Sequence, residues 1–343
     1  MIRIAIVGIG WAGARQVEAA RELGNDVSVE CLVDSDAAHL RAAASDLGIR
    51  KTYTTVGEAL EDPEIDAVSI CAPHRYHCDL AIQAAERGKH VLCEKPIALT
   101  VEDATRMIEA CDKAGVRLYV AENASYTPKA RFLRDVVRNG KYIGEVAAAA
   151  VVNGFRGVPY GYPGRREWLA NPEKGGTGTW MLHGIHAMAQ LRYVFGEVDT
   201  VYMGEHHAGS FGRTDIEGTV HGLLTMKDGY SVSVIQTCEV RLKADLKRYV
   251  IHGDRGTVWG WDDSWRVYGT GKQGDRVQEF GYPQAELSEY ALELAAFAAY
   301  VNLRVEGPTT GRSERRSLAI VQAGYESMRS GQPVNLTERF GEI

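Results

Sequence analysis

The chain has 343 residues, too many for one ordinary hydrophobic core, and this length fits two domains of roughly 120–200 residues each. Hydrophobic residues make up 45% and charged residues 24%, a balance typical of globular proteins that excludes disordered and fibrous classes. The formal net charge of −6 argues against binding to nucleic acid or to an anionic membrane, because both partners require a basic surface.

The sequence predicts neither a membrane span nor a leader. Apolar runs such as 146–152 are far shorter than the roughly 20 residues that cross a bilayer. Met1-Ile2-Arg3 leads directly into a short strand, so we expect no signal peptide. The six cysteines stand singly, without a C-x-x-C pair, which favours buried thiols over a disulfide framework or a zinc site. We therefore expect a cytoplasmic protein.

Short apolar runs alternate with amphipathic stretches over the first third of the chain. The runs barely alternate in polarity, so we predict strands covered on both faces at 4–7, 27–33, 67–72, 90–93 and 116–121. Helices are predicted between them at 12–23, 37–47, 78–87 and 101–114. This alternation indicates a doubly wound parallel sheet, which we assign to a dinucleotide-binding domain over residues 1–124.

After about residue 125 the pattern changes. Helices are predicted at 128–139, 179–195, 286–305 and 313–330. Short strands joined by tight turns such as Lys227-Asp228-Gly229 are predicted at 146–153, 198–206, 218–226, 230–238, 247–252, 257–261 and 265–268. Close turns between successive strands indicate an antiparallel sheet. We expect a second, α+β domain over 125–343, whose late segments can pack back on the first domain.

The strongest motif is Gly8-Ile9-Gly10-Trp11-Ala12-Gly13, which matches G-x-G-x-x-G. It follows a predicted strand and opens a predicted helix, so backbone N–H groups and the helix N-terminus can meet a pyrophosphate. We predict that all six positions except Ile9 contribute to a dinucleotide site. The alternative is a plain glycine turn.

Asp34 supports the dinucleotide interpretation, since it ends the second predicted strand 21 positions beyond Gly13. A carboxylate there can accept hydrogen bonds from the adenosine ribose hydroxyls and would repel a 2′-phosphate. NAD is therefore expected rather than NADP. Arg41 can reach back toward a phosphate, although an arginine on a helix face is its simpler role.

Two further segments follow predicted strands: Ala72-Pro73-His74-Arg75-Tyr76-His77 and Cys93-Glu94-Lys95-Pro96. With the glycine turn they make the chain resemble the Gfo/Idh/MocA oxidoreductase family. The resemblance covers essentially the whole chain, including Glu122-Asn123 and Gly184-Ile185-His186. It implies an N-terminal Rossmann domain, a C-terminal α+β domain with a large, mostly antiparallel open sheet, and NAD(P)-dependent oxidation of CH–OH groups. It also implies a homodimer or homotetramer formed through that sheet.

Ligands of open α/β sheets bind beyond the carboxyl ends of the strands, where Pro73, His77, Lys95 and Asn123 fall. Lys95 can hold a substrate hydroxyl, lower its pKa and relay its proton; the alternative is an exposed lysine at a strand end. By the resemblance, Glu94 and Asn123 lie near the nicotinamide end of the cofactor, and Ala72, Pro73 and His77 line the cofactor site. The competing interpretations are that Glu94 is a structural partner for Lys95, that Asn123 is a plain turn residue, and that His77 only caps a helix.

The resemblance also points to a substrate-binding helix, on which the family carries Asp-x-Gly-x-His. This chain has Leu182-His183-Gly184-Ile185-His186, so His186 matches the proposed acid/base histidine and Leu182 replaces the aspartate. Residues three apart share a helix face, so we expect His183 near His186, where it can take over a polar role in catalysis or substrate binding. The alternative for His186 is a packed core histidine.

A long loop rich in glycine, proline and arginine precedes that helix. Arg156, Arg165, Arg166, Trp168 and Lys174 lie in it, and loops of this length in compact domains are often functional. If these cations converge, an acidic sugar or a carboxylated cyclic diol fits better than a neutral hexose. The alternative is a solvated loop with surface ion pairs.

The leading hypothesis is a dehydrogenase that oxidises a secondary alcohol of a sugar, cyclitol or related cyclic polyol, with Lys95 and His186 handling the proton. A dihydrodiol dehydrogenase is the enzymatic alternative. A non-catalytic dinucleotide-binding regulator is the alternative of another class. We expect no metal site, nucleic-acid partner or membrane partner.

Overall fold

A computed structural model describes residues 1–140, 142–154, 168–169, 171–175, 178–207, 216–239, 246–261, 264–271, 274–281 and 285–342. The chain forms two compact units. The first unit comprises Met1–Asn123, Glu173–Gly175 and Glu286–Leu318. The second comprises Ala124–Pro172, Gly176–Ala285 and Ala319–Ile343.

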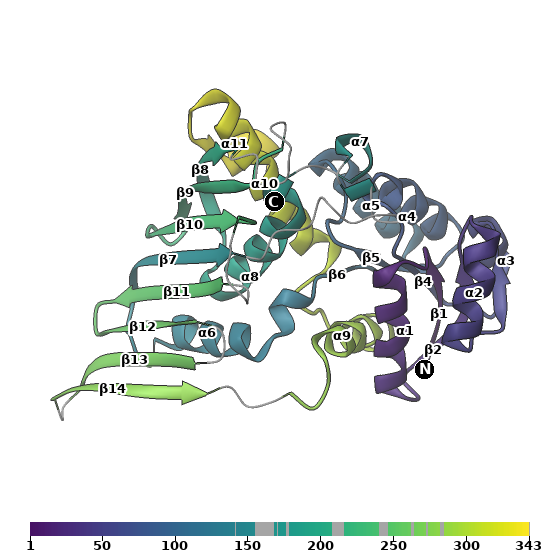
Figure 1. Ribbon diagram of the computed structural model, residues 1–343, viewed down its shortest axis with the longest axis horizontal. Coiled ribbons are helices and arrows are strands. Elements are labelled where there is room, and N and C mark those ends of the chain that lie inside the picture. The colour runs from purple at the N-terminus through teal and green to yellow at the C-terminus, as the bar shows by residue number, and fades with distance from the viewer. Residues whose placement is uncertain are drawn as a thin grey trace. The chain divides into compact units, whose positions relative to one another are not determined.

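The first unit is built on a six-stranded parallel sheet with the order β3-β2-β1-β4-β5-β6 (Figure 1). Its strands are β1 (Ile2–Val7), β2 (Val27–Val33), β3 (Lys51–Tyr53), β4 (Ala67–Ile70), β5 (His90–Glu94) and β6 (Leu118–Ala121). Its helices include α1 (Trp11–Leu23), α2 (Ala37–Leu47), α3 (Val56–Glu61), α4 (His77–Glu86), α5 (Val101–Ala114) and α9 (Glu289–Leu303), with a 3-10 turn at His74–Tyr76. The doubly wound parallel sheet expected from the sequence is confirmed.

Helix α9 comes from late in the chain and completes the core of the first unit. It lies beside α1, while α4 and α5 pack against each other. Leu294 and Phe297 of α9 are fully buried in the same cluster as Ile4 and Ile6 of β1 and Val17 of α1. Burying an aliphatic or aromatic side chain of this size stabilises a fold by about 1.5–3 kcal/mol. The late segment is therefore an integral part of this unit's core.

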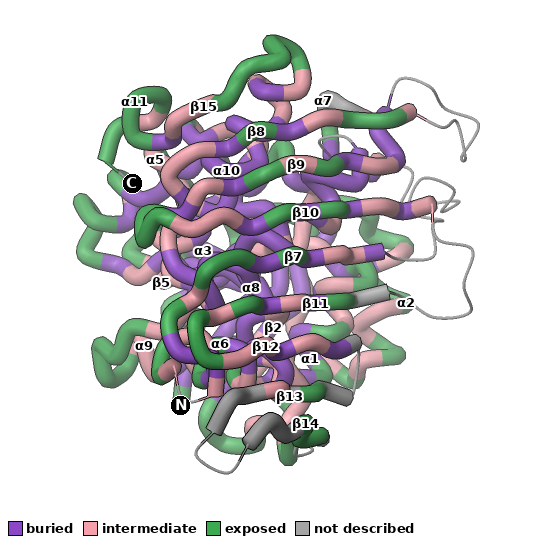
Figure 2. Tube along the Cα trace, turned by 90° about the vertical axis from the view of Figure 1, so that its left-hand side faces the viewer, coloured by how far each residue is buried: buried purple, intermediate pink, exposed green. Residues whose placement is uncertain are grey.

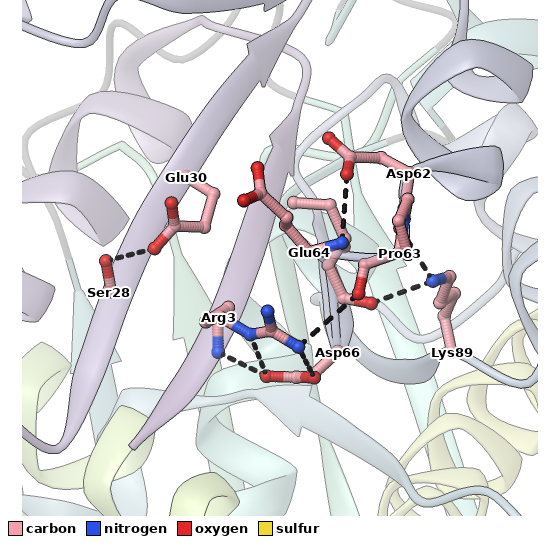
Figure 3. A network of polar contacts seen from close by, with 9 residues as sticks. Arg3, Ser28, Glu30, Asp62, Pro63, Glu64, Asp66 and Lys89 are labelled. Carbon is pink, nitrogen blue, oxygen red and sulfur yellow. Dashed lines mark hydrogen bonds and ion pairs between the residues drawn. The ribbon is translucent and has the colours of Figure 1, made fainter.

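Charged residues join the amino ends of the strands in the first unit (Figure 3). The Arg3 guanidinium donates to both carboxylate oxygens of Asp66, at 3.0 and 2.7 Å, and holds the pKa of that carboxyl below its usual value. The Lys89 ammonium donates to the carbonyl oxygens of Asp62 and Ile65 at 2.9 and 2.8 Å. These contacts fix the edge of the sheet opposite to the one where ligands of such folds bind.

The second unit contains a nine-stranded sheet with the order β14-β13-β12-β11-β7-β10-β9-β8-β15. Strands β7 and β10 pair in parallel and the other neighbours pair antiparallel, so the expected mostly antiparallel sheet is confirmed. The strands are β7 (Val146–Gly154), β8 (Val198–His206), β9 (Thr219–Met226), β10 (Ser231–Thr237), β11 (Leu246–Gly253), β12 (Gly256–Trp261), β13 (Ser264–Gly271), β14 (Gly274–Gly281) and β15 (Val334–Asn335).

Helices α6 (Pro128–Asn139) and α8 (Ile185–Phe195) pack against each other in the second unit. The buried Tyr249 of β11 donates its hydroxyl hydrogen to the Gln190 side chain of α8 at 2.7 Å. The Lys129 ammonium of α6 lies over the Tyr249 ring. Residues along β8, β9 and β10 alternate between buried and accessible positions (Figure 2), as expected for a sheet with one covered face. The remaining elements are a 3-10 turn at Asn123–Tyr126, α7 (Pro172–Gly175), α10 (Gly311–Ser330) and α11 (Leu336–Phe340).

Several elements differ from the expectation. The short β3, α3, β14, β15 and α11 were not predicted, because two to eight residues give too little periodicity. A signal for α3 was present, since Thr55 and Glu58 form a capping box at its start. The helix predicted at 179–195 is not regular, because Trp180–Gly184 forms a π-helical turn before α8.

Candidate functional site: the dinucleotide turn and the substrate helix

The glycine turn at the end of β1 packs backbone against backbone. Gly8 has φ +92°, and a Cβ there would lie 2.8 Å from backbone atoms of Cys71 and Ala72. A Cβ on Gly13 would lie 2.3 Å from the Gly8 carbonyl oxygen. Both positions therefore require glycine for close approach, one to the end of β4 and the other between α1 and the turn.

Gly10 is different, because no atom lies within 4 Å of the place where its Cβ would stand. It occupies the N-cap of α1 without a side-chain cap, and the first turn of that helix holds no acidic residue. The start of α1 thus lies beside open space at Gly10 and has neither a side-chain cap nor a carboxylate of its own. A pyrophosphate fits this arrangement, because it supplies both the missing acceptors and negative charge.

Asp34 is buried at the end of β2 and accepts two backbone N–H groups. Its two oxygens accept from Ile9 at 3.1 Å and from Asp36 at 3.0 Å, which joins the glycine turn to the start of α2. A carboxylate has about four lone-pair sites, so a group of this kind can accept ribose hydroxyls as well as backbone N–H groups. Asp36 caps α2, so a second carboxylate stands beside Asp34. Arg41 is exposed on α2.

His77 joins two loops at the carboxyl ends of β4 and β5. Its Nδ1 lies 2.9 Å from the Pro96 carbonyl oxygen and its Nε2 lies 2.9 Å from that of Ala72. The side chain is fully buried, and burial lowers its pKa. The peptide bond between Lys95 and Pro96 is cis. His77 therefore links the Ala72-Pro73 segment to the Lys95-Pro96 segment.

Glu94 ends β5 and Lys95 follows it, and both are half-buried. Burial raises the pKa of Glu94 to about 7, against the opposing effects of the Lys95 charge and of the Lys95 N–H, which donates to this carboxyl at 3.2 Å. Trp11, the exposed residue after Gly10, packs edge-to-face on Tyr290 of α9 at 6.1 Å. The half-buried Asn123 hydrogen-bonds the Tyr290 side chain. The first unit thus gathers the predicted cofactor residues at one edge of its sheet.

The second unit carries the predicted substrate residues on the π-helical turn and on α8. Leu182 is buried, whereas His183 and His186 are half-buried among buried neighbours. Spacing based on a regular α-helix does not hold across a π-turn, so the three-residue separation does not by itself place His183 beside His186. Such turns are frequent at functional sites.

Glu217 holds the start of the π-turn. Its Oε1 accepts the Trp180 backbone N–H at 2.9 Å and the Tyr325 hydroxyl at 2.8 Å, and the side chain is 3% exposed. The Trp180 indole donates to the Val321 carbonyl at 3.0 Å and packs so closely on Gly184 that a Cβ there would lie 2.5 Å from the ring. The motif glycine is therefore explained by packing, two residues before His186.

Replacing Glu217 with glutamine should remove part of the pH dependence of stability. Burial raises the pKa of Glu217 to about 7 from an ordinary 4.5, so the folded protein binds more protons than the unfolded chain between these values. Wild-type stability should then fall as pH rises through this window, by up to about 3 kcal/mol from this residue.

The Glu217→Gln side chain still accepts both hydrogen bonds but does not titrate. Chemical denaturation from pH 4.5 to 8 should show that the free energy of unfolding of Glu217→Gln increases relative to that of the wild type as pH rises. Glu217→Ala is the matched control and should be about 1–3 kcal/mol less stable than Glu217→Gln at every pH, because the Trp180 N–H loses its acceptor. A constant difference between wild type and Glu217→Gln would contradict the raised pKa.

Some predicted loop residues lie outside the described part of the chain, namely Arg156, Arg165 and Arg166. Trp168 is half-buried and Lys174 is exposed. Within the described residues, no group of three or more His, Cys, Asp or Glu side chains is placed to hold a metal ion. None of the helices in the same residues is long and apolar enough to cross a membrane.

The buried polar residues that were not singled out in the sequence include Gln16, Glu217 and Glu293. Glu293 had a signal, because it is an acid within the apolar run Ala291-Leu292-Glu293-Leu294-Ala295. Gln16 had a weaker one, as a polar residue on the buried side of α1. Glu217 had none, since it precedes a strand as many solvent-exposed acids do.

Comparison with known proteins agrees with the geometry of each unit. Residues 2–122 match the family model described as "Oxidoreductase family, NAD-binding Rossmann fold", and residues 134–336 match its "C-terminal alpha/beta domain". Myo-inositol 2-dehydrogenase of Thermotoga maritima is 27% identical over 99% of this chain and 100% of its own length. The 1,5-anhydro-D-fructose reductase of Ensifer adhaerens is 28% identical over 93% of this chain and 94% of its own.

Solved structures show the same fold. A levoglucosan dehydrogenase in complex with NADH and levoglucosan aligns with a TM-score of 0.87 at 19% identity, covering 98% of this chain and 99% of that one. An oxidoreductase from Agrobacterium radiobacter in complex with NAD+, L-tartaric acid and magnesium aligns at 0.85 and 21%, over 99% of both chains. Since the two family models together span most of the sequence, the chain belongs to the Gfo/Idh/MocA oxidoreductase family, as its resemblance implied, and is an oxidoreductase.

Proposed function

We propose that the protein is an NAD-dependent dehydrogenase that oxidises a secondary alcohol of a sugar, cyclitol or related cyclic polyol. The observation that carries this proposal is the uncapped start of α1 at Gly10, which fits a pyrophosphate and stands in the same unit as Lys95. Relatives named as inositol and sugar dehydrogenases or reductases support the substrate class.

The cofactor would be held by backbone N–H groups of the glycine turn at its pyrophosphate and by Asp34 at the adenosine ribose. Asp34 and Asp36 place two carboxylates at the end of β2, which disfavours a 2′-phosphate. One relative is nevertheless named as an NADP-dependent xylose dehydrogenase, so cofactor choice varies in the family. We propose NAD for this chain.

When bound, NAD would accept the hydride. The chain's own residues would handle the proton. Lys95 would hold the substrate hydroxyl with its ammonium and lower the pKa of that hydroxyl, and His186 would take up the proton as general base. We keep His183 as a candidate polar contact, because it is half-buried on the same turn as the buried Leu182. A buried leucine at the family aspartate position leaves that part of the substrate site apolar.

A substrate panel tests the proposal. Purified protein should reduce NAD faster than NADP with one or more polyols, cyclitols or aldoses, measured by absorbance of the reduced cofactor. Turnover only with cyclohexadiene diols would favour a dihydrodiol dehydrogenase instead. Dinucleotide binding without turnover on any of these compounds would favour a regulator and overturn the proposal.

We also propose that the protein forms a homodimer or homotetramer through the open sheet of the second unit. Tyr202, Leu223 and Ile235 are 41–49% exposed on neighbouring strands β8, β9 and β10, and these large side chains occupy accessible positions of the alternating pattern. Exposed apolar side chains that gather on one face are typical of subunit contacts. Light scattering should give the mass of two or four chains.

A further inference from the structure

A buried acid and a buried amide pair within the first unit, where α1 meets α9. Glu293 of α9 is 1% exposed and Gln16 of α1 is fully buried. The Gln16 Nε2 donates to the Glu293 Oε1 at 3.1 Å. Neither side chain belongs to the glycine turn or to the family's strand-end motifs, so the proposed function leaves this pair without a role.

The second oxygens of these two side chains point to a protonated Glu293. Glu293 Oε2 and Gln16 Oε1 are both buried without a hydrogen-bond partner among the described residues. Two acceptors cannot satisfy each other, and leaving buried polar atoms unsatisfied is costly. A proton on Glu293 Oε2 would turn one of these two acceptors into a donor, for which the unpaired Gln16 Oε1 is the candidate acceptor.

The surroundings of Glu293 favour the protonated form as well. The groups that face it are the Glu289 carboxyl from α9, the Glu94 carboxyl from β5, the Glu122 carboxyl after β6 and the Gln16 amide from α1. Burial and these three carboxyls raise the pKa of Glu293 well above its usual value, and only the Gln16 amide opposes them. An ionised Glu293 would add another negative charge beside Glu94.

We propose that Glu293 is held as a neutral carboxylic acid and that Gln16, fixed by it, positions the Glu94 carboxylate next to Lys95. The Gln16 amide that donates to Glu293 also lies close enough to the Glu94 carboxyl to lower its pKa, so one amide faces both acids. Glu293 is thus a positioning residue that acts through Gln16. This second step rests on the proposed function, whereas the protonation of Glu293 does not.

The first test replaces Glu293 with glutamine, which reproduces a neutral acid in shape and in hydrogen bonding but does not titrate. Denaturation without substrate should show that Glu293→Gln becomes more stable relative to the wild type from pH 5 to 8. Its unfolding constant should fall relative to that of the wild type by up to tenfold per pH unit. Glu306→Gln, at an exposed acid in the same unit, is the control and should run parallel to the wild type. Parallel curves for Glu293→Gln would show an ionised Glu293 and overturn the proposal.

The second test replaces Gln16 with methionine, which keeps the volume and removes the amide. NADH affinity of the wild type should change around pH 7 as Glu94 titrates, and the variant should move this transition upward by about half a pH unit or more. A transition that stays in place, or that is absent from the wild type, overturns the positioning role even if Glu293 is neutral. If Gln16→Met does not fold, Gln16→Asn, with a shorter amide, should also move the transition upward. Neither test uses a substrate, so both results can be interpreted even if no substrate is found.

Discussion

Replacing Lys95 with alanine should lower kcat by about 10²–10⁴-fold while NADH still binds. General acid–base groups contribute about this much to catalysis, and the loss includes the electrostatic hold on the developing alkoxide. Binding should persist because the pyrophosphate and ribose groups would contact the glycine turn and Asp34, whose contacts do not involve Lys95. Steady-state rates with the best substrate of the panel, together with NADH fluorescence titration, measure both quantities.

Two controls make the Lys95 result specific. Lys113→Ala removes an exposed lysine in the last turn of α5 and should leave kcat unchanged. Lys95→Arg keeps the positive charge and should retain more activity than alanine, but less than wild type, because the guanidinium has a different donor geometry. Turnover by Lys95→Ala at the wild-type rate would exclude Lys95 from the proton transfer.

Replacing Gly13 with alanine should lower the stability of the protein, whereas replacing Gly10 with alanine should lower its affinity for NAD. The methyl group of Gly13→Ala would lie 2.3 Å from the Gly8 carbonyl oxygen, so the backbone must move. We expect this variant to lose at least about 1–3 kcal/mol of stability. The methyl group of Gly10→Ala would have no protein atom within 4 Å, so stability should change by less than about 1 kcal/mol. NAD affinity should nevertheless fall at least about tenfold in Gly10→Ala, a cost of about 1.4 kcal/mol.

Chemical denaturation without cofactor and calorimetric titration with NAD separate these effects. Gly10→Ala thus tests where the pyrophosphate lies, with Gly13→Ala as its structural counterpart. Wild-type affinity in Gly10→Ala would mean that the phosphates do not approach this turn. Wild-type stability in Gly13→Ala would mean that α1 and the turn are less closely packed than the structure shows.

The fold followed from local patterns wherever an element was long and its surroundings uniform. Strand β2, 27–33, and helix α5, 101–114, were predicted with the bounds that the structure has, because apolar periodicity and Thr100 at the N-cap mark them locally. The irregular π-turn at Trp180–Gly184 was not predictable in this way. It depends on Glu217 and Val321, which are far away in the sequence.

The sequence by itself determined the dinucleotide turn, because Gly8, Gly10, Gly13 and Asp34 all lie in one contiguous βαβ segment. Only the tertiary structure decided what surrounds Glu94 and what holds His77. Gln16 and Glu293 are 277 residues apart, and their pairing follows from α9 packing on α1 in the first unit. Hydrogen bonds of buried polar groups are set by which elements meet in the core, and no local pattern encodes that meeting.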